Sequence, residues 1–351
     1  MPAPTPYLQV DLVRMRRNVR DAAERASVAQ VALRPHAKTH KSVEIARLQL
    51  ASGAAGLTVA TIGEAEVFVR HGCDDVFIAY PLWLDDRSAG RLRDLADRAT
   101  VAIGVDSSDA AANAARLLGG TAVEVLVEVD SGQHRTGCHP DDAGVVASVA
   151  ARGGLRVRGV FTFPGHSYSP GGGADAADDE RRALAAARDA VQAHGLDVRV
   201  LSGGSTPSLR DTDAGTVGEV RPGVYVLGDA QQWELGTMSP DEIALTAVAT
   251  VVSHAGGRAV LDAGSKVLGA DRAAYATGHG RLLDHPAARI VALSEHHAVV
   301  DLAGSPLPRL GETVRVVPNH VCAAVNLADT LWVEEHGSLR SWTVSARGRN
   351  S

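Results

Sequence analysis

The chain has 351 residues, 45% of them hydrophobic, and its 35 Lys and Arg residues against 41 Asp and Glu residues give a net charge of -6. This acidic balance argues against a nucleic-acid-binding protein, which usually carries a basic face. No apolar run approaches the roughly 20 residues that span a bilayer, and the first residues lack a secretory leader. Three cysteines, Cys73, Cys138 and Cys322, are too few for a disulfide framework. The composition therefore predicts a soluble cytoplasmic protein, and the length predicts about two domains.

The first two-thirds of the chain alternates short apolar runs with helical stretches. We expect eight runs to be buried parallel strands, namely Val28–Leu33, Gly56–Thr61, Asp75–Pro81, Val101–Asp106, Val123–Asp130, Leu155–Phe163, Val198–Leu201 and Glu219–Leu227. Helices are expected between most of them, at Lys41–Ala51, Ile62–His71, Arg87–Ala99 and Asp178–His194, and the stretch Ser169–Asp179 is expected to form an exposed loop. This pattern favours an α/β fold, a (β/α)8 barrel of the TIM type, over the alternative of a doubly wound open sheet.

After about residue 240 the pattern changes to short strand-like runs separated by turns, with few helix signals. These runs are Leu245–Val252, Arg258–Asp262, Arg289–Leu293, Val299–Leu302, Thr313–Val317 and Leu331–Glu335. They predict an antiparallel β domain. We therefore expect a barrel over residues 1–240, whose first ten or so residues could pack with the second domain, and a β domain over residues 241–351.

The first predicted strand is followed by a segment rich in basic residues, at the end of the barrel where active sites form. Its sequence is Arg34-Pro35-His36-Ala37-Lys38-Thr39-His40-Lys41. Nearby positive charges would disfavour the ammonium form of Lys38 and favour the free amine that Schiff-base formation requires. A solvated basic loop is the simpler interpretation of the same residues.

Later strand ends add further polar and glycine-rich turns. The fifth ends in Glu128-Val129-Asp130-Ser131-Gly132-Gln133-His134-Arg135-Thr136-Gly137, whose Arg could pair with a phenolate or carboxylate. The sixth ends in Phe163-Pro164-Gly165-His166-Ser167-Tyr168, which offers a His and a Tyr. The seventh ends in Ser202-Gly203-Gly204-Ser205-Thr206-Pro207, where Pro207 suits the start of a helix whose N–H groups could hold a phosphate. The eighth adds Arg221-Pro222-Gly223-Val224-Tyr225, and two such turns together are typical of barrel phosphate sites.

The β domain contributes the segment Pro318-Asn319-His320-Val321-Cys322. On an extended chain His320 and Cys322 would point the same way and could bind one metal ion, Zn²⁺ above all. Two protein ligands would leave positions open for water and substrate, as in a catalytic site. The alternative is a buried cysteine beside a histidine whose hydrogen bonds are satisfied.

Five of these segments resemble the motifs of one enzyme family. They occur in the family's order over nearly the whole chain and contain Lys38, Tyr168, Thr206, Gly223 and His320. This family is the D-threonine aldolase and eukaryotic-type D-serine dehydratase family, which has the alanine racemase fold of a pyridoxal-phosphate (PLP) barrel and a C-terminal β domain. The resemblance implies that Lys38 carries PLP, that Arg135 lies by its phenolic oxygen and that Tyr168 lies near its ring. It further implies that Thr206 and the backbone N–H groups of Gly223 and Val224 hold the phosphate, and that His320 and Cys322 bind the catalytic metal.

The same resemblance implies a choice between two reactions. In the aldolases the second metal ligand is commonly acidic, whereas Cys322 stands here as in the zinc-dependent D-serine dehydratases. This favours conversion of D-serine or D-threonine to a 2-oxo acid and ammonia, with cleavage of D-threonine to glycine and acetaldehyde as the alternative. A non-catalytic PLP-binding protein is a third hypothesis. The family also implies a small D-amino acid substrate, Zn²⁺ or another divalent ion such as Mn²⁺, and a homodimer.

Overall fold

The computed structural model describes residues 4–351, and these form two compact units. The barrel unit consists of Ala22–Lys38, Ala46–Gly223 and Arg349–Ser351. The β unit consists of Thr39–Ile45, Val224–Gly348 and the described N-terminal residues up to Asp21. The domain boundary expected between residues 240 and 241 stays a prediction.

The barrel unit is built on an eight-stranded parallel sheet, in the order β2-β9-β8-β7-β6-β5-β4-β3. Its strands are β2 (Ala32–Leu33), β3 (Leu57–Val59), β4 (Asp75–Pro81), β5 (Thr100–Val105), β6 (Glu124–Glu128), β7 (Arg156–Phe161), β8 (Val200–Gly203) and β9 (Glu219–Val220). The two outer strands, β2 and β3, meet through a parallel bridge between His36 and Thr58, and Ala37 N–H donates to the carbonyl of Thr58 at 2.8 Å. The curled sheet therefore closes on itself, and the predicted barrel is confirmed.

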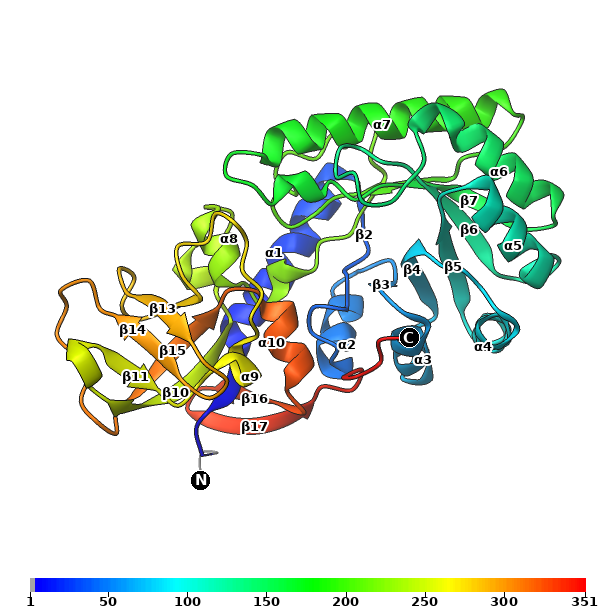
Figure 1. Ribbon diagram of the computed structural model, residues 1–351. Helices are drawn as coiled ribbons and strands as arrows, with labels where there is room; N and C mark the ends of the chain where they lie inside the picture. Colours follow the sequence, from blue (N-terminus) through cyan, green and yellow to red (C-terminus); the bar gives the residue numbers. More distant parts are fainter. Residues whose placement is uncertain (1–3) are drawn as a thin grey trace. The chain divides into compact units, whose positions relative to one another are not determined.

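Helices follow most of these strands, and three of them begin at residues whose side chains cap them. The helices are α1 (Leu12–Ala29), α2 (Val43–Ala51), α3 (Ile62–Arg70), α4 (Asp86–Ala96), α5 (Ser108–Leu118), α6 (Ala143–Arg152) and α7 (Gly173–Ala193). The side chains of Thr61, Asp85 and Ser107 accept hydrogen bonds from the first turns of α3, α4 and α5, as good N-cap residues do. The consecutive helices α3 to α7 pack side by side around the strands (Figure 1).

Three barrel segments differ from the sequence-based expectation. The run from Val28 is helical until Ala29, because Gln30 takes the left-handed conformation (φ 57°) and ends α1 just before β2. The run from Glu219 is a strand for two residues only, since Pro222 has no N–H to donate to a neighbouring strand. The exposed loop expected over Ser169–Asp179 is wrong in its second half, where α7 has already begun at Gly173.

The barrel interior is filled mostly by small and branched apolar side chains. Phe77 and Phe161 meet edge to face, with ring centroids 4.9 Å apart, and pack with Ala102 and Leu126. The fully buried guanidinium of Arg221 lies 5.3 Å from the Phe161 ring centre and donates to Ser202 Oγ and the carbonyl of Thr162, both at 2.5 Å. This core fixes the strands whose ends carry the predicted site.

The β unit contains a nine-stranded sheet in the order β11-β14-β13-β12-β15-β10-β1-β16-β17. Its strands are β1 (Tyr7–Asp11), β10 (Leu245–Ser253), β11 (Ala259–Leu261), β12 (Gly280–Leu282), β13 (Arg289–Leu293), β14 (Ala298–Asp301), β15 (Thr313–Pro318), β16 (Thr330–Glu335) and β17 (Ser338–Thr343). Because β10 pairs with both β15 and β11, six of these strands close into a small barrel. Every pairing is antiparallel except β1 with β16, so the predicted antiparallel β domain is confirmed.

Short helices complete the described chain. The 3-10 helices are η1 (Pro140–Asp142), η2 (Gly165–Ser167), η3 (Val224–Val226), η4 (Pro240–Glu242) and η5 (Ala255–Gly257). The short α-helices are α8 (Ala230–Glu234), α9 (Ser265–Leu268) and α10 (Val321–Leu327). Over the described residues, none of the helices is both long and apolar enough to cross a membrane.

Candidate active site

Three of the predicted cofactor residues converge on one aromatic ring in the barrel unit. The Nζ atom of Lys38 lies 6.0 Å from the centre of the Phe163 ring, and the guanidinium carbon of Arg135 lies 5.2 Å from it. The Tyr168 ring is tilted by 42° to the same ring at a centroid distance of 6.1 Å. These side chains come from segments that follow β2, β6 and β7, so the barrel brings together residues that lie up to 130 positions apart.

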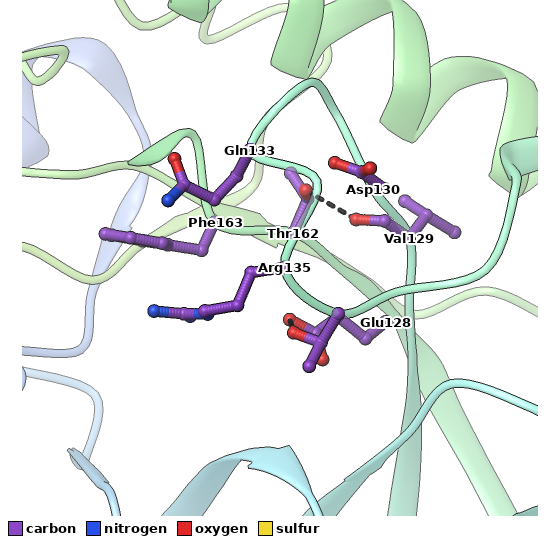
Figure 2. Close-up of a pocket in the computed structure, with 8 residues that line it drawn as sticks. Glu128, Val129, Asp130, Gln133, Arg135, Thr162 and Phe163 are labelled. Carbon is purple, nitrogen blue, oxygen red and sulfur yellow. Dashed lines mark hydrogen bonds between the residues drawn. The ribbon is translucent and has the colours of Figure 1, made fainter. Parts of the chain in front are cut away.

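Arg135 is held by a compact loop between β6 and η1. The carboxylate of Asp130 accepts hydrogen bonds from the backbone N–H groups of Gly132 (2.8 Å) and His134 (3.0 Å), while Asp130 and Cys138 join the two ends of the loop by a backbone bond of 3.0 Å. Thr162 Oγ1 donates to the carbonyl of Val129 at 2.6 Å, which ties the loop to the end of β7. Figure 2 shows the resulting pocket, in which the side chain of Arg135 lies alongside the Phe163 ring.

Glu128 lines the same pocket and was not singled out by the sequence. Its Oε1 accepts a hydrogen bond from Thr136 Oγ1 at 3.0 Å, and its buried Oε2 has no hydrogen-bond partner among the described residues. Burial raises the pKa of Glu128 to about 7, against the opposing influence of Thr136 and Arg135. The pocket therefore contains a carboxyl group that can gain or lose a proton near neutral pH.

The turn after β8 is built from buried hydroxyl groups. Ser205 Oγ lies 2.8 Å from the hydroxyls of both Ser167 and Ser208, and Ser208 N–H donates to Ser205 Oγ at 3.2 Å. Thr206 is buried beside them. The helix expected to start at Pro207 is absent from this described segment, which forms hydrogen-bonded turns instead. Hydroxyls and turn amides, rather than a helix N-terminus, are therefore the groups available for a phosphate.

Gly223 is the last residue of this part of the barrel unit, and Val224 opens the β unit as the first residue of η3. Among the described residues, no carbonyl or side chain accepts a hydrogen bond from either backbone N–H group. Buried backbone donors are nearly always paired in folded proteins. This leaves room for the expected role of Gly223 and Val224 in holding a phosphate, and that role stays a prediction.

The charges around Lys38 differ from the sequence-based picture. Arg34, expected to disfavour the ammonium form, is buried and bound at 2.6 Å to Glu219 and at 2.9 and 3.0 Å to the two carboxylate oxygens of Asp75. Its charge is neutralised by these two acids. Arg34 therefore ties the segment after β2 to the starts of β4 and β9.

In the β unit, His320 and Cys322 lie side by side, although not for the reason that the sequence suggested. Only His320 has extended backbone, since Cys322 lies in the first turn of α10, for which His320 is the N-cap. The two side chains nevertheless hydrogen-bond to each other. The Sγ–H of Cys322 also donates to Thr39 Oγ1 at 3.3 Å, and Thr39 directly follows Lys38 in the chain.

Two carboxylates support this pair. Asp271 Oδ2 lies 3.0 Å from His320 Nδ1, and the fully buried Asp229 accepts the N–H of Val321 at 3.1 Å and that of Gln232 at 2.9 Å. Burial disfavours a charged imidazole, but Cys322, Asp229 and Asp271 together raise the pKa of His320 to about 10. Among the described residues no third His, Cys, Asp or Glu completes a cluster that could hold a metal. The donor set is thus one imidazole and one thiol.

The other two cysteines lie apart from this chemistry. Burial raises the pKa of Cys73 to about 11 and that of Cys138 to about 12. Each thiol donates to a carbonyl at 3.4 Å, Cys73 to that of Asp75 and Cys138 to that of Glu128. Such thiols remain protonated at neutral pH, and Cys73 is buried whereas Cys138 is half-buried.

Comparison with known proteins agrees with this architecture. The family model "Alanine racemase, N-terminal domain" matches residues 10–231, and "Putative serine dehydratase domain" matches residues 244–334. D-threo-3-hydroxyaspartate dehydratase of Delftia sp. is 33% identical, over 91% of each chain. D-threonine aldolase of Arthrobacter sp. is 32% identical, over 98% of this chain and 93% of its own.

Solved structures of such proteins superpose closely. The Delftia dehydratase gives a TM-score of 0.89 at 32% identity over 97% of both chains. D-threonine aldolase of Filomicrobium marinum gives 0.87 at 30% identity, over 99% of this chain and 96% of its own. Two further structures of D-threo-3-hydroxyaspartate dehydratase carry alanine in place of a histidine and, two positions later, of a cysteine, the latter variant in a metal-free form.

The fold and these matches define an alanine racemase-like protein, of the structural class that binds PLP in a barrel. Within this class, the chain belongs to the D-threonine aldolase and D-serine dehydratase family. Its homologues are lyases that act on D-hydroxy amino acids.

Proposed function

We propose that the chain is a PLP- and metal-dependent lyase of D-β-hydroxy amino acids that acts as a dehydratase on D-serine, D-threonine or D-threo-3-hydroxyaspartate. The observation that carries the proposal is the convergence of Lys38, Arg135 and Tyr168 on the Phe163 ring. An amine, a guanidinium and a phenol around one aromatic ring suit a flat, anionic, aldehyde-bearing cofactor.

The residues present fit PLP. Lys38 would hold its aldehyde carbon through Nζ, and Arg135 would lie by its phenolic oxygen. Thr206 Oγ1 and the backbone N–H groups of Gly223 and Val224 would hold its phosphate, and the available amides support this role. When bound, PLP withdraws electrons from the substrate carbon next to the amino group. Lys38 Nζ, once free, would accept the proton from that carbon.

His320 and Cys322 fit a metal such as Zn²⁺, because one imidazole and one thiolate are the ligands that this ion prefers. The hydrogen bond between the two side chains means that a proton must leave the pair when a metal binds. Such an ion acts as a Lewis acid that polarises oxygen atoms of a substrate.

Cys322 favours dehydration over aldol cleavage. A histidine and a cysteine with the same two-residue spacing are the residues replaced in the two variants of D-threo-3-hydroxyaspartate dehydratase, one of them metal-free. Cleavage of D-threonine to glycine and acetaldehyde is the second candidate, supported by the aldolase relative that matches 98% of this chain. Zinc as the metal and a homodimer as the assembly complete the proposal.

Product analysis separates these functions. The purified protein, supplied with PLP and Zn²⁺, is incubated with D-serine, D-threonine and D-threo-3-hydroxyaspartate, with and without a chelator. A dehydratase gives a 2-oxo acid and equimolar ammonia, and loses activity on chelation. Glycine and an aldehyde without 2-oxo acid would establish the aldolase instead, and a bound cofactor whose spectrum no D-amino acid changes would support a non-catalytic protein.

A further inference from the structure

Glu180 is a carboxylic acid on α7, inside the barrel unit, to which the proposed function gives no role. Its side chain is fully buried, and its Oε1 accepts a hydrogen bond from the backbone N–H of Gly204 at 2.6 Å. Its Oε2 is also buried and has no hydrogen-bond partner among the described residues. One oxygen of Glu180 therefore holds the turn that leads to Thr206, while the other is unsatisfied.

The turn is shaped to receive this carboxyl group. A Cβ atom at Gly203 would lie 2.6 Å from the carboxyl carbon of Glu180, so the space that any side chain would need is already filled. Gly204 has a φ of +76°, a conformation that favours glycine, and this conformation accompanies the bond from its N–H to Glu180. The two glycines of the segment Ser202–Pro207 are thus explained by Glu180 and by the backbone of the turn.

The surroundings favour the neutral form of this acid. Burial raises the pKa of Glu180 to about 7, although the hydrogen bond from Gly204 and the positive charge of Arg221 both act to lower it. The elements packed against α7 carry other charged or titratable side chains, namely Asp141 and Asp142 of η1, Arg152 of α6, Arg156 and Arg158 of β7, and His166 of η2. Among the described residues, Arg221 is the charge that acts on Glu180.

We propose that Glu180 is a positioning residue for the phosphate turn, and that it carries a proton whenever a phosphate group is bound there. This inference rests on the proposed function, since it assumes that the turn receives the phosphate of PLP. A phosphate dianion at the turn would repel a carboxylate bonded to Gly204. The neutral acid keeps an acceptor oxygen for Gly204 and removes the repulsion, so binding takes up one proton from solvent if Glu180 is ionised beforehand.

The test compares two ligands that differ only in the phosphate, PLP and pyridoxal, on the full-length wild type and on Glu180→Gln. Glutamine keeps an acceptor for Gly204 but cannot ionise. Between pH 6 and pH 8.5 we expect the PLP affinity of the wild type to fall by about 30-fold relative to that of the variant, because above a pKa of about 7 each pH unit costs a factor of ten when binding takes up one proton. The ratio for pyridoxal should not change. Asp189→Asn, on an exposed carboxylate of the same helix, should follow the wild type.

A second measurement needs no variant. At pH 8, calorimetry in buffers of different ionisation enthalpy should show that PLP takes up nearly one proton more than pyridoxal does on binding to the wild type. Equal proton uptake, or equal pH profiles for the wild type and Glu180→Gln, would overturn the role of Glu180 while leaving the proposed function intact. Failure of the wild type to bind PLP at any pH would overturn both.

Discussion

Phe163 is the residue around which the candidate site is organised, and it shows how an apolar side chain can gather polar ones. Its ring lies beside Lys38 Nζ, the guanidinium of Arg135 and the ring of Tyr168. A cation over an aromatic face gains about 0.5–2 kcal/mol, depending on how far it is desolvated. Arg135, and Lys38 when it is protonated, can each gain this energy from the same ring.

The role of Lys38 can be tested by trapping. If Lys38 carries PLP, borohydride reduction of the loaded protein will fix the mass of the cofactor on the peptide that contains Lys38, as found by mass spectrometry. Lys38→Ala should lose both this label and the long-wavelength absorbance of the bound cofactor. Lys266→Ala is the matched control, because Lys266 is exposed and paired with Glu295. Label found on Lys41 or Lys266 would contradict the assignment.

The role of Asp271 can be tested by metal affinity. A carboxylate that accepts the Nδ1–H of a metal-binding histidine fixes the ring and its tautomer, and removing such a partner typically costs 10- to 100-fold in affinity. We therefore expect Asp271→Asn to weaken Zn²⁺ binding to the cofactor-free protein by about that factor, measured by isothermal titration calorimetry. Asp241→Asn, a change at an exposed carboxylate of the β unit, should bind like the wild type. An unchanged affinity in Asp271→Asn would show that the 3.0 Å contact does not orient His320.

At the scale of elements, the contact between β8 and α7 predicts how a substitution at Gly203 changes stability. Gly203→Ala places a methyl group against the buried carboxyl of Glu180, and overpacking of this kind costs about 1–3 kcal/mol. Gly90→Ala is the matched control, since a Cβ at Gly90, on α4, meets no atom within 4 Å. Alanine should stabilise that helix by about 0.5–1 kcal/mol. Urea unfolding followed by far-UV circular dichroism measures both, and equal stabilities would refute the packing argument.

The elements also show what could be predicted from the sequence. The order of strands and helices followed from the alternation of apolar and helical runs, and β4 and β13 have the expected bounds. The lengths of β2 and β9 could not be predicted from this alternation, because they depend on the left-handed conformation of Gln30 and on Pro222. Strands β1, β12 and β17 were missed. The three-residue β12 is defined by its partners β13 and β15 rather than by a pattern of its own.

The candidate site was predictable only as a set of strand ends. Its polar residues follow strands, so the barrel rule places them at one end. Phe163, Glu128 and Glu180 were missed, because their importance depends on which distant segment each one meets. Glu180, for example, meets Gly204, 24 positions later in the chain. The partners of Arg34, Asp75 and Glu219, could not be predicted either, because they are remote in sequence.

At the scale of the whole molecule, the net charge of -6 counts every Asp and Glu as ionised. Two buried carboxyl groups are not ionised throughout the neutral pH range. Burial raises the pKa of both Glu128 and Glu180 from 4.5 to about 7. In the unfolded chain these groups lose their protons near pH 4.5, so between about pH 4.5 and 7 the folded protein holds protons that the unfolded chain has released. Both groups therefore favour folding at acidic pH, and this contribution disappears as the pH rises through the folded-state pKa.

This linkage predicts how stability depends on pH. The free energy of unfolding of the wild type minus that of Glu128→Gln/Glu180→Gln should fall between about pH 4.5 and 7, by up to about 1.4 kcal/mol per pH unit for each carboxyl, and then level off. Groups present in both proteins cancel in this difference. The measurement is urea unfolding of both proteins at half-unit pH intervals. A difference that stays constant across this range would mean that neither buried carboxyl holds its proton more tightly in the folded protein, whereas a rise with pH would mean that Arg135 and Arg221 outweigh burial.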